Sequence, residues 1–263
     1  MINFDFKKSL GQNFLNDENI IDKIVKSSEI DKDTLVIEIG PGAGALSKKT
    51  IPLSGYTILY EIDTRLKDIL CNVLKNFDNY KIIFNDVLKQ DIKSDISNYN
   101  YKKIYVVANL PYYITTPIIS KVIDEIKPDK IVIMIQEEVA DRLCAKVGSK
   151  DYAMITVALG SQYDIKKLFK VSRNCFTPAP NVDSAVISLD RHDKYEIINK
   201  DIFDKLIKDA FRFKRKNLRN NLKGYDLVKI ENILSRDNYS LNDRAEAIPI
   251  QKFVDIANSL INK

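Results

Sequence analysis

The sequence predicts an α/β fold in which a doubly wound, mostly parallel sheet is followed by a small all-helical region. Three observations predict it. Short apolar runs recur with helical stretches between them, the last two runs are joined by a proline-rich link without a helix, and the strand pattern stops around residues 192–199. Alternation of strands and helices is typical of a right-handed parallel sheet. The helix-free link predicts a hairpin and therefore one antiparallel edge strand.

The expected elements follow in chain order. Apolar runs of strand length occupy residues 35–39, 57–62, 81–84, 104–108, 131–136, 164–171 and 184–189. Helical spacing then occupies residues 201–213, 216–222 with Gly224 as the C-cap, 226–235 and 250–261. We therefore expect a sheet domain over residues 1–190 and a helical domain over residues 191–263.

Composition limits the class of protein. The chain has 263 residues, enough for one large and one small domain, and its hydrophobic fraction of 45% fits a globular core. No apolar run approaches the roughly 20 residues that span a bilayer, and residues 1–15 lack the apolar stretch of a signal peptide. We expect a cytoplasmic protein with no membrane partner.

Cysteine and histidine usage argues against several chemistries. Cys71, Cys144 and Cys175 lie far apart without ligand spacing, so we expect neither disulfides nor a zinc site. The single histidine, His192, belongs to no motif. The sequence therefore predicts no metal centre and no Ser-His-Asp mechanism.

The positive charge is concentrated at the C-terminal end. Residues 191–263 carry 16 Lys and Arg against 11 Asp and Glu, whereas residues 1–190 carry 25 of each. If residues 202–223 formed one helix, basic side chains would form a continuous stripe along it, although a break near residues 213–215 would split that stripe. This asymmetry predicts a polyanionic partner.

The segment Asn109-Leu110-Pro111-Tyr112 follows the apolar run 104–108. Ligands of open parallel sheets bind just beyond the carboxyl ends of strands. An acceptor on Asn109, with the carbonyl of Leu110 or Pro111, could bind the exocyclic amine of a base, and Tyr112 could stack on its ring. The pattern resembles the Asn/Asp-Pro-Pro-Tyr-type motif of amino-group methyltransferases. The alternative is a strand end followed by a proline turn.

A glycine-rich segment, residues 38–45, follows the first predicted strand and opens a helix. Glycines there let the backbone approach a ligand closely. Gly40, Gly42 and Ala45 also match the dinucleotide-binding fingerprint G-x-G-x-x-G/A. Glu61 lies 21 residues after Gly40, which is the position of the ribose-binding acidic residue in NAD-dependent enzymes. An NAD dehydrogenase is therefore an open alternative. Glu38 weighs against it, because its carboxylate would repel a pyrophosphate but could pair with the cationic amino group of S-adenosylmethionine.

Asp86 ends the third predicted strand. Its carboxylate could accept a hydrogen bond from an adenine amine, and the alternative role is a helix N-cap.

Taken in order, these segments resemble the class I methyltransferase fold, and longer motifs are similar to those of the rRNA adenine dimethyltransferases. The motifs occupy residues 8–15, 136–143, 148–152, 176–184, 216–220 and 244–246. The resemblance spans the whole chain and is closest to the bacterial small-subunit enzymes, the KsgA family. That family dimethylates N6 of two adjacent adenosines near the 3′ end of 16S rRNA.

The resemblance implies roles for individual residues. S-adenosylmethionine would be bound by Asn13, Leu15, Gly40, Gly42, Glu61, Asp86 and Asn109. The target adenine would be held by Asn109, Pro111 and Tyr112, with Phe176 on its other face, although a Phe in that setting is otherwise more often a core residue. Gln12 and Asn13 would belong to an N-terminal arm over the cofactor, with Lys7 and Lys8 near phosphates.

The same resemblance implies the partner. That partner is 16S rRNA within an immature small ribosomal subunit, bound by a monomer that needs no metal. Because the basic stripe coincides with the positive charge excess of the chain, we expect Arg215, Lys216 and Arg219 to contact rRNA phosphates. Two alternatives stay open. One is a large-subunit methylase of macrolide resistance, a group that more often has Ile where Leu110 stands. The other is a ribosome-assembly factor whose binding outlasts or replaces catalysis, and the intact segment 109–112 disfavours a purely binding role.

Overall fold

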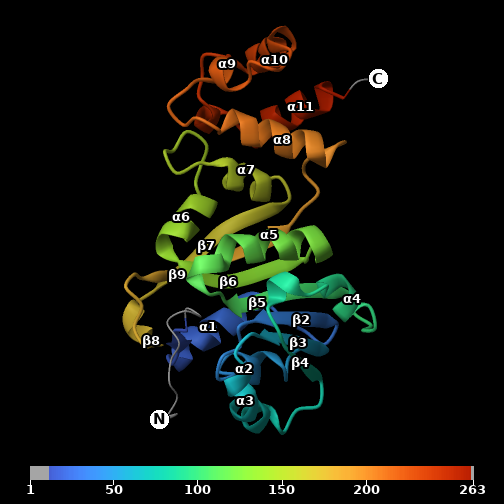
Figure 1. Cartoon of the computed structure of the whole chain (residues 1–263), viewed down its shortest axis with the longest axis vertical. Helices are drawn as coiled ribbons and strands as arrows, with labels where there is room; N and C mark the ends of the chain where they lie inside the picture. Colours follow the sequence, from blue (N-terminus) through green and yellow to red (C-terminus); the bar gives the residue numbers. More distant parts are fainter. Residues whose placement is uncertain (1–11, 262–263) are drawn as a thin grey trace. The chain divides into compact units, whose positions relative to one another are not determined.

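The structure, a computed structural model, describes residues 12–261 and divides into two compact units (Figure 1). The first unit comprises the described residues up to Ala140 together with Lys166–Asp190, and the second comprises Asp141–Ile165 and the residues from Arg191 onward. Residues 141–165, which the sequence analysis placed with the sheet, belong to the second unit. The reason is packing, because Tyr152 and Val157 lie in the helical core.

A seven-stranded sheet forms the framework of the first unit. Its strands are β2 (Thr34–Ile39), β3 (Tyr56–Glu61), β4 (Tyr80–Phe84), β5 (Lys103–Asn109), β6 (Lys130–Gln136), β7 (Tyr163–Val171) and β9 (Ser184–Arg191). Their order is β4-β3-β2-β5-β6-β9-β7. Strands β2 to β6 pair in parallel, and β9 runs antiparallel to β6, with β7 at the edge beside it. The predicted mostly parallel sheet with a reversed strand at one side is confirmed.

Short elements surround this sheet. The helices are α1 (Glu18–Ser28), α2 (Ser47–Thr50), α3 (Lys67–Leu74), α4 (Ile92–Ile96), α5 (Thr115–Ile126) and α6 (Glu137–Leu143), and a separate two-stranded sheet joins β1 (Phe14–Leu15) to β8 (Phe176–Thr177). Asp17 is the N-cap of helix α1, and its carboxylate accepts from two backbone N–H groups. The helix buries Ile21 and Ile24 against Val36 and Val132 of the sheet. Among residues 12–261, no helix is long and apolar enough to cross a membrane.

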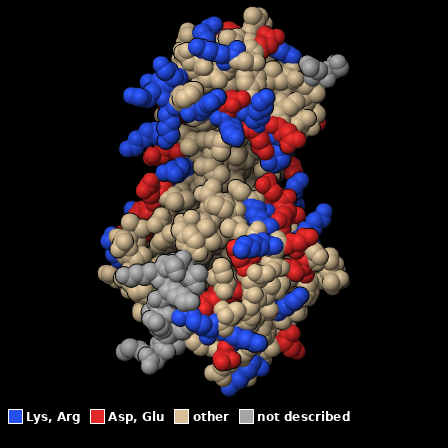
Figure 2. All heavy atoms as spheres, in the orientation of Figure 1, with Lys and Arg blue, Asp and Glu red and all other residues tan. Residues whose placement is uncertain are grey.

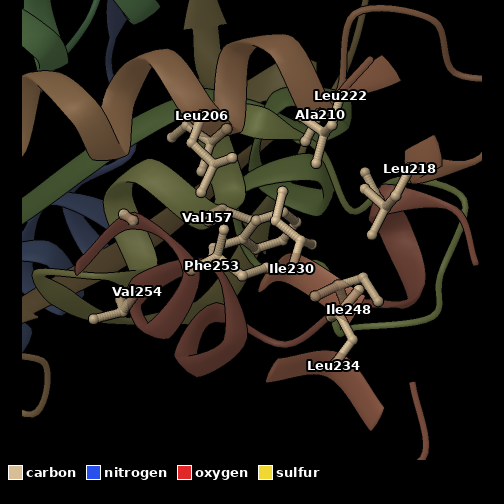
Figure 3. Packing of buried hydrophobic residues seen from close by; sticks show 14 of the residues in the cluster. Val157, Leu206, Ala210, Leu218, Leu222, Ile230, Leu234, Ile248, Phe253 and Val254 are labelled. Atoms are coloured by element: carbon tan, nitrogen blue, oxygen red, sulfur yellow. The ribbon is translucent and has the colours of Figure 1, made fainter. Parts of the chain in front are cut away.

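The second unit is a helical cluster around its own core. Its helices are α7 (Met154–Gly160), α8 (Lys200–Ala210), α9 (Leu218–Asn221), α10 (Leu227–Leu234) and α11 (Ile250–Ser259). Figure 3 shows side chains from α7, α8, α10 and α11 converging, among them Leu206, Ile230 and Phe253, which are buried. Helical spacing in the sequence predicted helices at the positions of α8, α9, α10 and α11.

Two details of the predicted helices differ from the structure. Helix α8 ends at Ala210 rather than at residue 213, and α9 covers only Leu218–Asn221, with Leu222 rather than Gly224 at its C-cap position. The continuous basic stripe is therefore interrupted by a turn over residues 211–216, in which residues 212–216 are exposed. The turn is stabilised locally, because the Asn221 side-chain amide donates to the last carbonyl of α8, that of Ala210, at 2.7 Å.

Candidate active site

A cavity of about 610 Å³ lies in the first unit, at the carboxyl ends of β2, β3 and β5. Its walls come from the segments that follow these three strands and from residues 12–16. This is the place where open parallel sheets bind ligands. The predicted site residues that line it are Asn13, Leu15, Gly40, Gly42, Glu61, Asn109, Pro111 and Tyr112.

The glycine segment forms one wall because its backbone needs conformations that other residues rarely adopt. Gly40 has φ +70° and Gly42 has φ +59°. A Cβ atom on Gly42 would lie 3.0 Å from Cε1 of Phe14, so no side chain fits there without displacing that ring. The Gly42 N–H donates to Oε2 of Glu61 at 3.0 Å, which ties this loop to the end of β3.

Glu61 is a buried carboxylate that is held from two sides. Oε2 accepts from Gly42, and Oε1 accepts from the Asp63 N–H at 2.8 Å. Burial raises the pKa of Glu61, while these backbone donors lower it in part. Each carboxylate oxygen has more than one lone pair, so the group can accept two further donors from the cavity. A vicinal diol supplies two donors of this kind.

Glu38 is an unsatisfied acceptor in the wall of the same cavity. Its side chain is 2% exposed, and Oε2 has no hydrogen-bond partner within residues 12–261. Burial raises the pKa of Glu38 to about 8, and the nearby charge of Glu61 adds to the rise. A buried acceptor without a partner is costly. A cationic amine in the cavity would satisfy it.

The Asn109 amide is oriented by the N-terminal segment. Its Nδ2 donates to the backbone carbonyl of Asn13 at 3.2 Å. This contact leaves Oδ1 as the acceptor that Asn109 offers to the cavity. Asn13 therefore acts on the site through its backbone.

The structure distinguishes the two carbonyls that the sequence left open. The Pro111 carbonyl accepts from the Thr115 hydroxyl at 3.1 Å and from the Ile114 N–H at 3.4 Å. The Leu110 carbonyl has no such partner in the described part of the chain, and Leu110 lines the cavity. Leu110 is therefore the better second acceptor beside Asn109.

Tyr112 is fixed by a residue that the sequence analysis did not single out. Its hydroxyl shares a hydrogen bond of 2.6 Å with Oγ of Ser184, at the start of β9. Ser184 is fully buried. The two residues are 72 positions apart, so only the fold reveals the pair.

We expect Ser184→Ala to lower turnover about two- to tenfold with little effect on cofactor affinity, because the lost hydrogen bond is worth roughly 0.5–1.5 kcal/mol and only orients the ring. Tyr112→Phe should behave similarly. The double variant should be no worse than either single one, because the two substitutions remove the same bond. A double-mutant cycle on turnover and on unfolding measures this, and additive losses would show that the two residues act independently.

Two predicted residues are not brought to the cavity. Asp86 caps the short turn η3 (Val87–Lys89), where Oδ1 accepts from the Leu88 N–H at 3.0 Å, which is the N-cap role left open by the sequence. Phe176 is 4% exposed and packs in the core beside Leu15, its partner in the β1–β8 pairing. Its neighbour Thr177 lines the cavity instead.

The N-terminal segment is anchored on both sides of the site. Nε2 of Gln12 donates to Oδ2 of Asp63 at 2.7 Å, and Leu15 pairs with Phe176. Asp63 was not among the predicted site residues. Its position two residues after Glu61 is the sequence signal that could have identified it. Lys7 and Lys8, with the first half of motif 8–15, lie outside the described residues.

The three predicted RNA-binding residues lie in the second unit. Arg215 and Lys216 belong to the turn between α8 and α9, Arg219 belongs to α9, and all three are exposed. Figure 2 shows Lys and Arg side chains gathered on the side of this unit where α9 lies in Figure 1. Within residues 12–261 none of the three forms an ion pair, so their charges are available to a polyanion.

Known proteins resemble this chain in sequence and in fold. A model of the family "Ribosomal RNA adenine dimethylase" matches residues 3–262. Ribosomal RNA small subunit methyltransferase A of Streptococcus gordonii is 41% identical over 98% of this chain and 92% of its own length. A dimethyladenosine transferase from Plasmodium falciparum has a similar crystal structure, with TM-score 0.76, 25% identity, and coverage of 94% and 98% of the two chains. The 23S rRNA methyltransferase ErmE shares the fold at TM-score 0.75 and 23% identity, covering 94% and 99%.

Proposed function

Because this chain belongs to the ribosomal RNA adenine dimethylase family, we propose that it transfers methyl groups from S-adenosylmethionine to N6 of two adjacent adenosines near the 3′ end of 16S rRNA. The product is N6,N6-dimethyladenosine. One observation carries the proposal. The Asn109 amide, oriented by Asn13, shares a single cavity with the buried carboxyl groups of Glu38 and Glu61.

The cavity fits the proposed cofactor. The unsatisfied Oε2 of Glu38 suits the amino group of the methionine part, and Glu61 suits the two ribose hydroxyls. Gly40 and Gly42 keep the cavity wall free of side chains, and Asn13 and Leu15 lie on the segment that borders it. Asp86 would accept a hydrogen bond from the adenine amine if its side chain rotated away from the Leu88 N–H. When bound, S-adenosylmethionine supplies an electrophilic methyl group on a sulfonium.

The residues after β5 prepare the nucleophile. The lone pair of an adenine amine is delocalised into the ring, so the amine attacks poorly. Oδ1 of Asn109 and the Leu110 carbonyl accept its two N–H groups and favour a pyramidal nitrogen. The Tyr112 ring, held by Ser184, stacks on the base, while Pro111 fixes the turn. The contribution of these residues is orientation.

Transfer of a second methyl group to the same nitrogen needs no additional catalytic residue. The nitrogen proton becomes strongly acidic once the nitrogen is alkylated, so water or a weak acceptor removes it. Asn109 is a neutral acceptor and can still bond an amine that retains one hydrogen. The same site can therefore hold a monomethylated adenosine for a second round.

The proposed partner is 16S rRNA in an immature small ribosomal subunit, bound by a monomer in the cytoplasm. Arg215, Lys216 and Arg219 would contact phosphates, which position the substrate without reading its sequence. The large-subunit alternative has less support, because the likeness to ErmE is one of fold. The relative at 41% identity is named for the small subunit.

We expect replacement of Arg215, Lys216 and Arg219 by Ala to weaken rRNA binding and to flatten its salt dependence. Each lost phosphate contact should reduce the log–log slope by about 0.7–0.9. Cofactor affinity should not change. A matched variant that removes three exposed lysines of the first unit, Lys67, Lys75 and Lys81, should keep the slope. An unchanged slope in the first variant would show that these cations only face solvent.

The proposal is tested by offering the enzyme labelled S-adenosylmethionine with free 16S rRNA, immature small subunits and large subunits. We expect the label in small-subunit rRNA. Label in 23S rRNA would favour the large-subunit methylase, and tight binding to small subunits without any label would favour an assembly factor.

A further inference from the structure

The turn between α8 and α9 exposes an aromatic ring among cations. Phe213 is 54% exposed, and its neighbours Arg212, Lys214, Arg215 and Lys216 are all exposed as well. Among the exposed large hydrophobic residues described in the second unit, Phe213 is the only aromatic one. A ring left in water forfeits the free energy of burial, and here the exposed ring is surrounded by cations.

A nearby phenylalanine shows that an aromatic side chain of this turn can pack against the helical core. Phe211, two residues earlier, packs with its ring centroid 5.7 Å from that of Phe253 and 6.1 Å from that of Tyr152. Phe213 instead lies outside this core, with the Arg212 guanidinium 5.3 Å from its ring centroid. This distance is typical of a cation–π contact.

Hydrogen bonds hold the turn in this form. The Phe213 carbonyl accepts from the Lys216 N–H at 2.9 Å and from Nδ2 of Asn221 at 3.3 Å, and the same Nδ2 donates to Ala210. The Arg212 N–H donates to the Asp209 carbonyl at 3.2 Å. The ring is therefore presented by an ordered backbone, which lowers the entropy cost of binding a partner.

We propose that Phe213 is a stacking platform for an unpaired base of the rRNA, with the surrounding cations bound to the adjoining phosphates. Within residues 12–261 neither Lys214 nor Arg212 forms an ion pair, and residues 211–219 contain no acidic side chain. Exposed rings among unpaired cations are the combination that binds single-stranded nucleic acid. The inference rests on the proposed RNA contact of Arg215, Lys216 and Arg219.

Salt dependence separates stacking from charge. Phe213→Ala should weaken binding to immature small subunits and to free 16S rRNA roughly 5- to 150-fold at every salt concentration, with an unchanged log–log slope. Its binding to heparin, a polyanion without bases, should not change. Val228→Ala, at a residue 73% exposed in the same unit, is the matched control and should bind normally.

A tryptophan at the same position reports the contact directly. The chain contains no Trp, so Phe213→Trp introduces a single indole fluorophore. This variant should restore rRNA affinity, and its emission should be quenched when 16S rRNA is added. Val228→Trp should show no quenching. Because these readouts do not depend on methyl transfer, they are independent of the catalytic site.

The outcomes distinguish this inference from the function on which it rests. Normal rRNA binding by Phe213→Ala, together with a flattened slope for the triple variant at positions 215, 216 and 219, would overturn stacking and leave the phosphate contact intact. A flattened log–log salt slope for Phe213→Ala would show that the ring only positions the neighbouring basic side chains and does not stack on a base. Loss of binding to particles but not to free rRNA would indicate a ribosomal protein as the partner of Phe213 and would also overturn the inference.

Discussion

Asn109→Ala is expected to slow methyl transfer about 10²–10³-fold, the usual cost of removing one preorganised polar contact to a transition state. The acceptor Oδ1 matters most as the adenine amine becomes pyramidal. Binding of rRNA should be close to normal, because the proposed phosphate contacts lie elsewhere in the chain. The Asn13 carbonyl loses its donor in this variant, so a small loss of cofactor affinity is also expected.

The measurement is single-turnover methylation of immature small subunits with saturating cofactor, beside rRNA affinity for the same variant. Asn98→Ala removes an exposed amide of the same unit and should leave both quantities unchanged. Near-normal turnover by Asn109→Ala would show that Asn109 is only a strand-end residue.

Glu61→Ala should produce the largest loss of cofactor affinity. Two charge-assisted hydrogen bonds to the ribose would disappear, each worth roughly 1.5–3 kcal/mol. Together they correspond to an increase of about 10²–10⁴ in Kd. The Gly42 and Asp63 N–H groups would also lose their acceptor, which loosens the wall that Gly42 forms.

Calorimetry with S-adenosylmethionine checks this result. Asp68→Ala removes an exposed carboxylate of the same unit that does not line the cavity, and it should bind the cofactor normally. Unchanged affinity of Glu61→Ala would refute the ribose assignment. Binding of NAD by the wild-type protein would restore the dehydrogenase interpretation of the glycine segment.

The sheet and the position of the site could be predicted from the sequence because both follow from local patterns. Buried strands give continuous apolar runs, and a parallel sheet brings their carboxyl ends to one edge. Gly40, Glu61 and Asn109 follow or end three such runs, so their meeting in one cavity follows from topology.

Other features depend on pairs that are distant in sequence. Nothing local to Tyr112 predicts its bond to Ser184, and the occupied Pro111 carbonyl depends on how the Thr115 hydroxyl turns. The core position of Phe176 follows from the β1–β8 pairing, which joins strands too short to show a pattern. Residues 141–165 join the second unit through packing, which periodicity does not report.

The end of helix α8 also depends on contacts that the local sequence pattern does not show. Apolar and basic residues recur at helical spacing throughout residues 202–222. The sequence pattern therefore does not reveal the turn at which helix α8 ends. The Asn221 amide satisfies the Ala210 carbonyl, and Asn217 caps α9 by accepting from the Asn220 N–H. The result is the exposed turn that carries Phe213, Arg215 and Lys216.

Nucleoside mass spectrometry after exhaustive reaction tests whether the enzyme dimethylates adenosine in small-subunit rRNA. Immature small subunits lacking the modification are incubated with the enzyme and S-adenosylmethionine, and the 16S rRNA is digested. We expect N6,N6-dimethyladenosine at two adjacent positions near the 3′ end, and none with Asn109→Ala over the same time. Monomethyladenosine as the sole end product, or methylated cytosine, would show that the enzyme is not an adenosine dimethyltransferase.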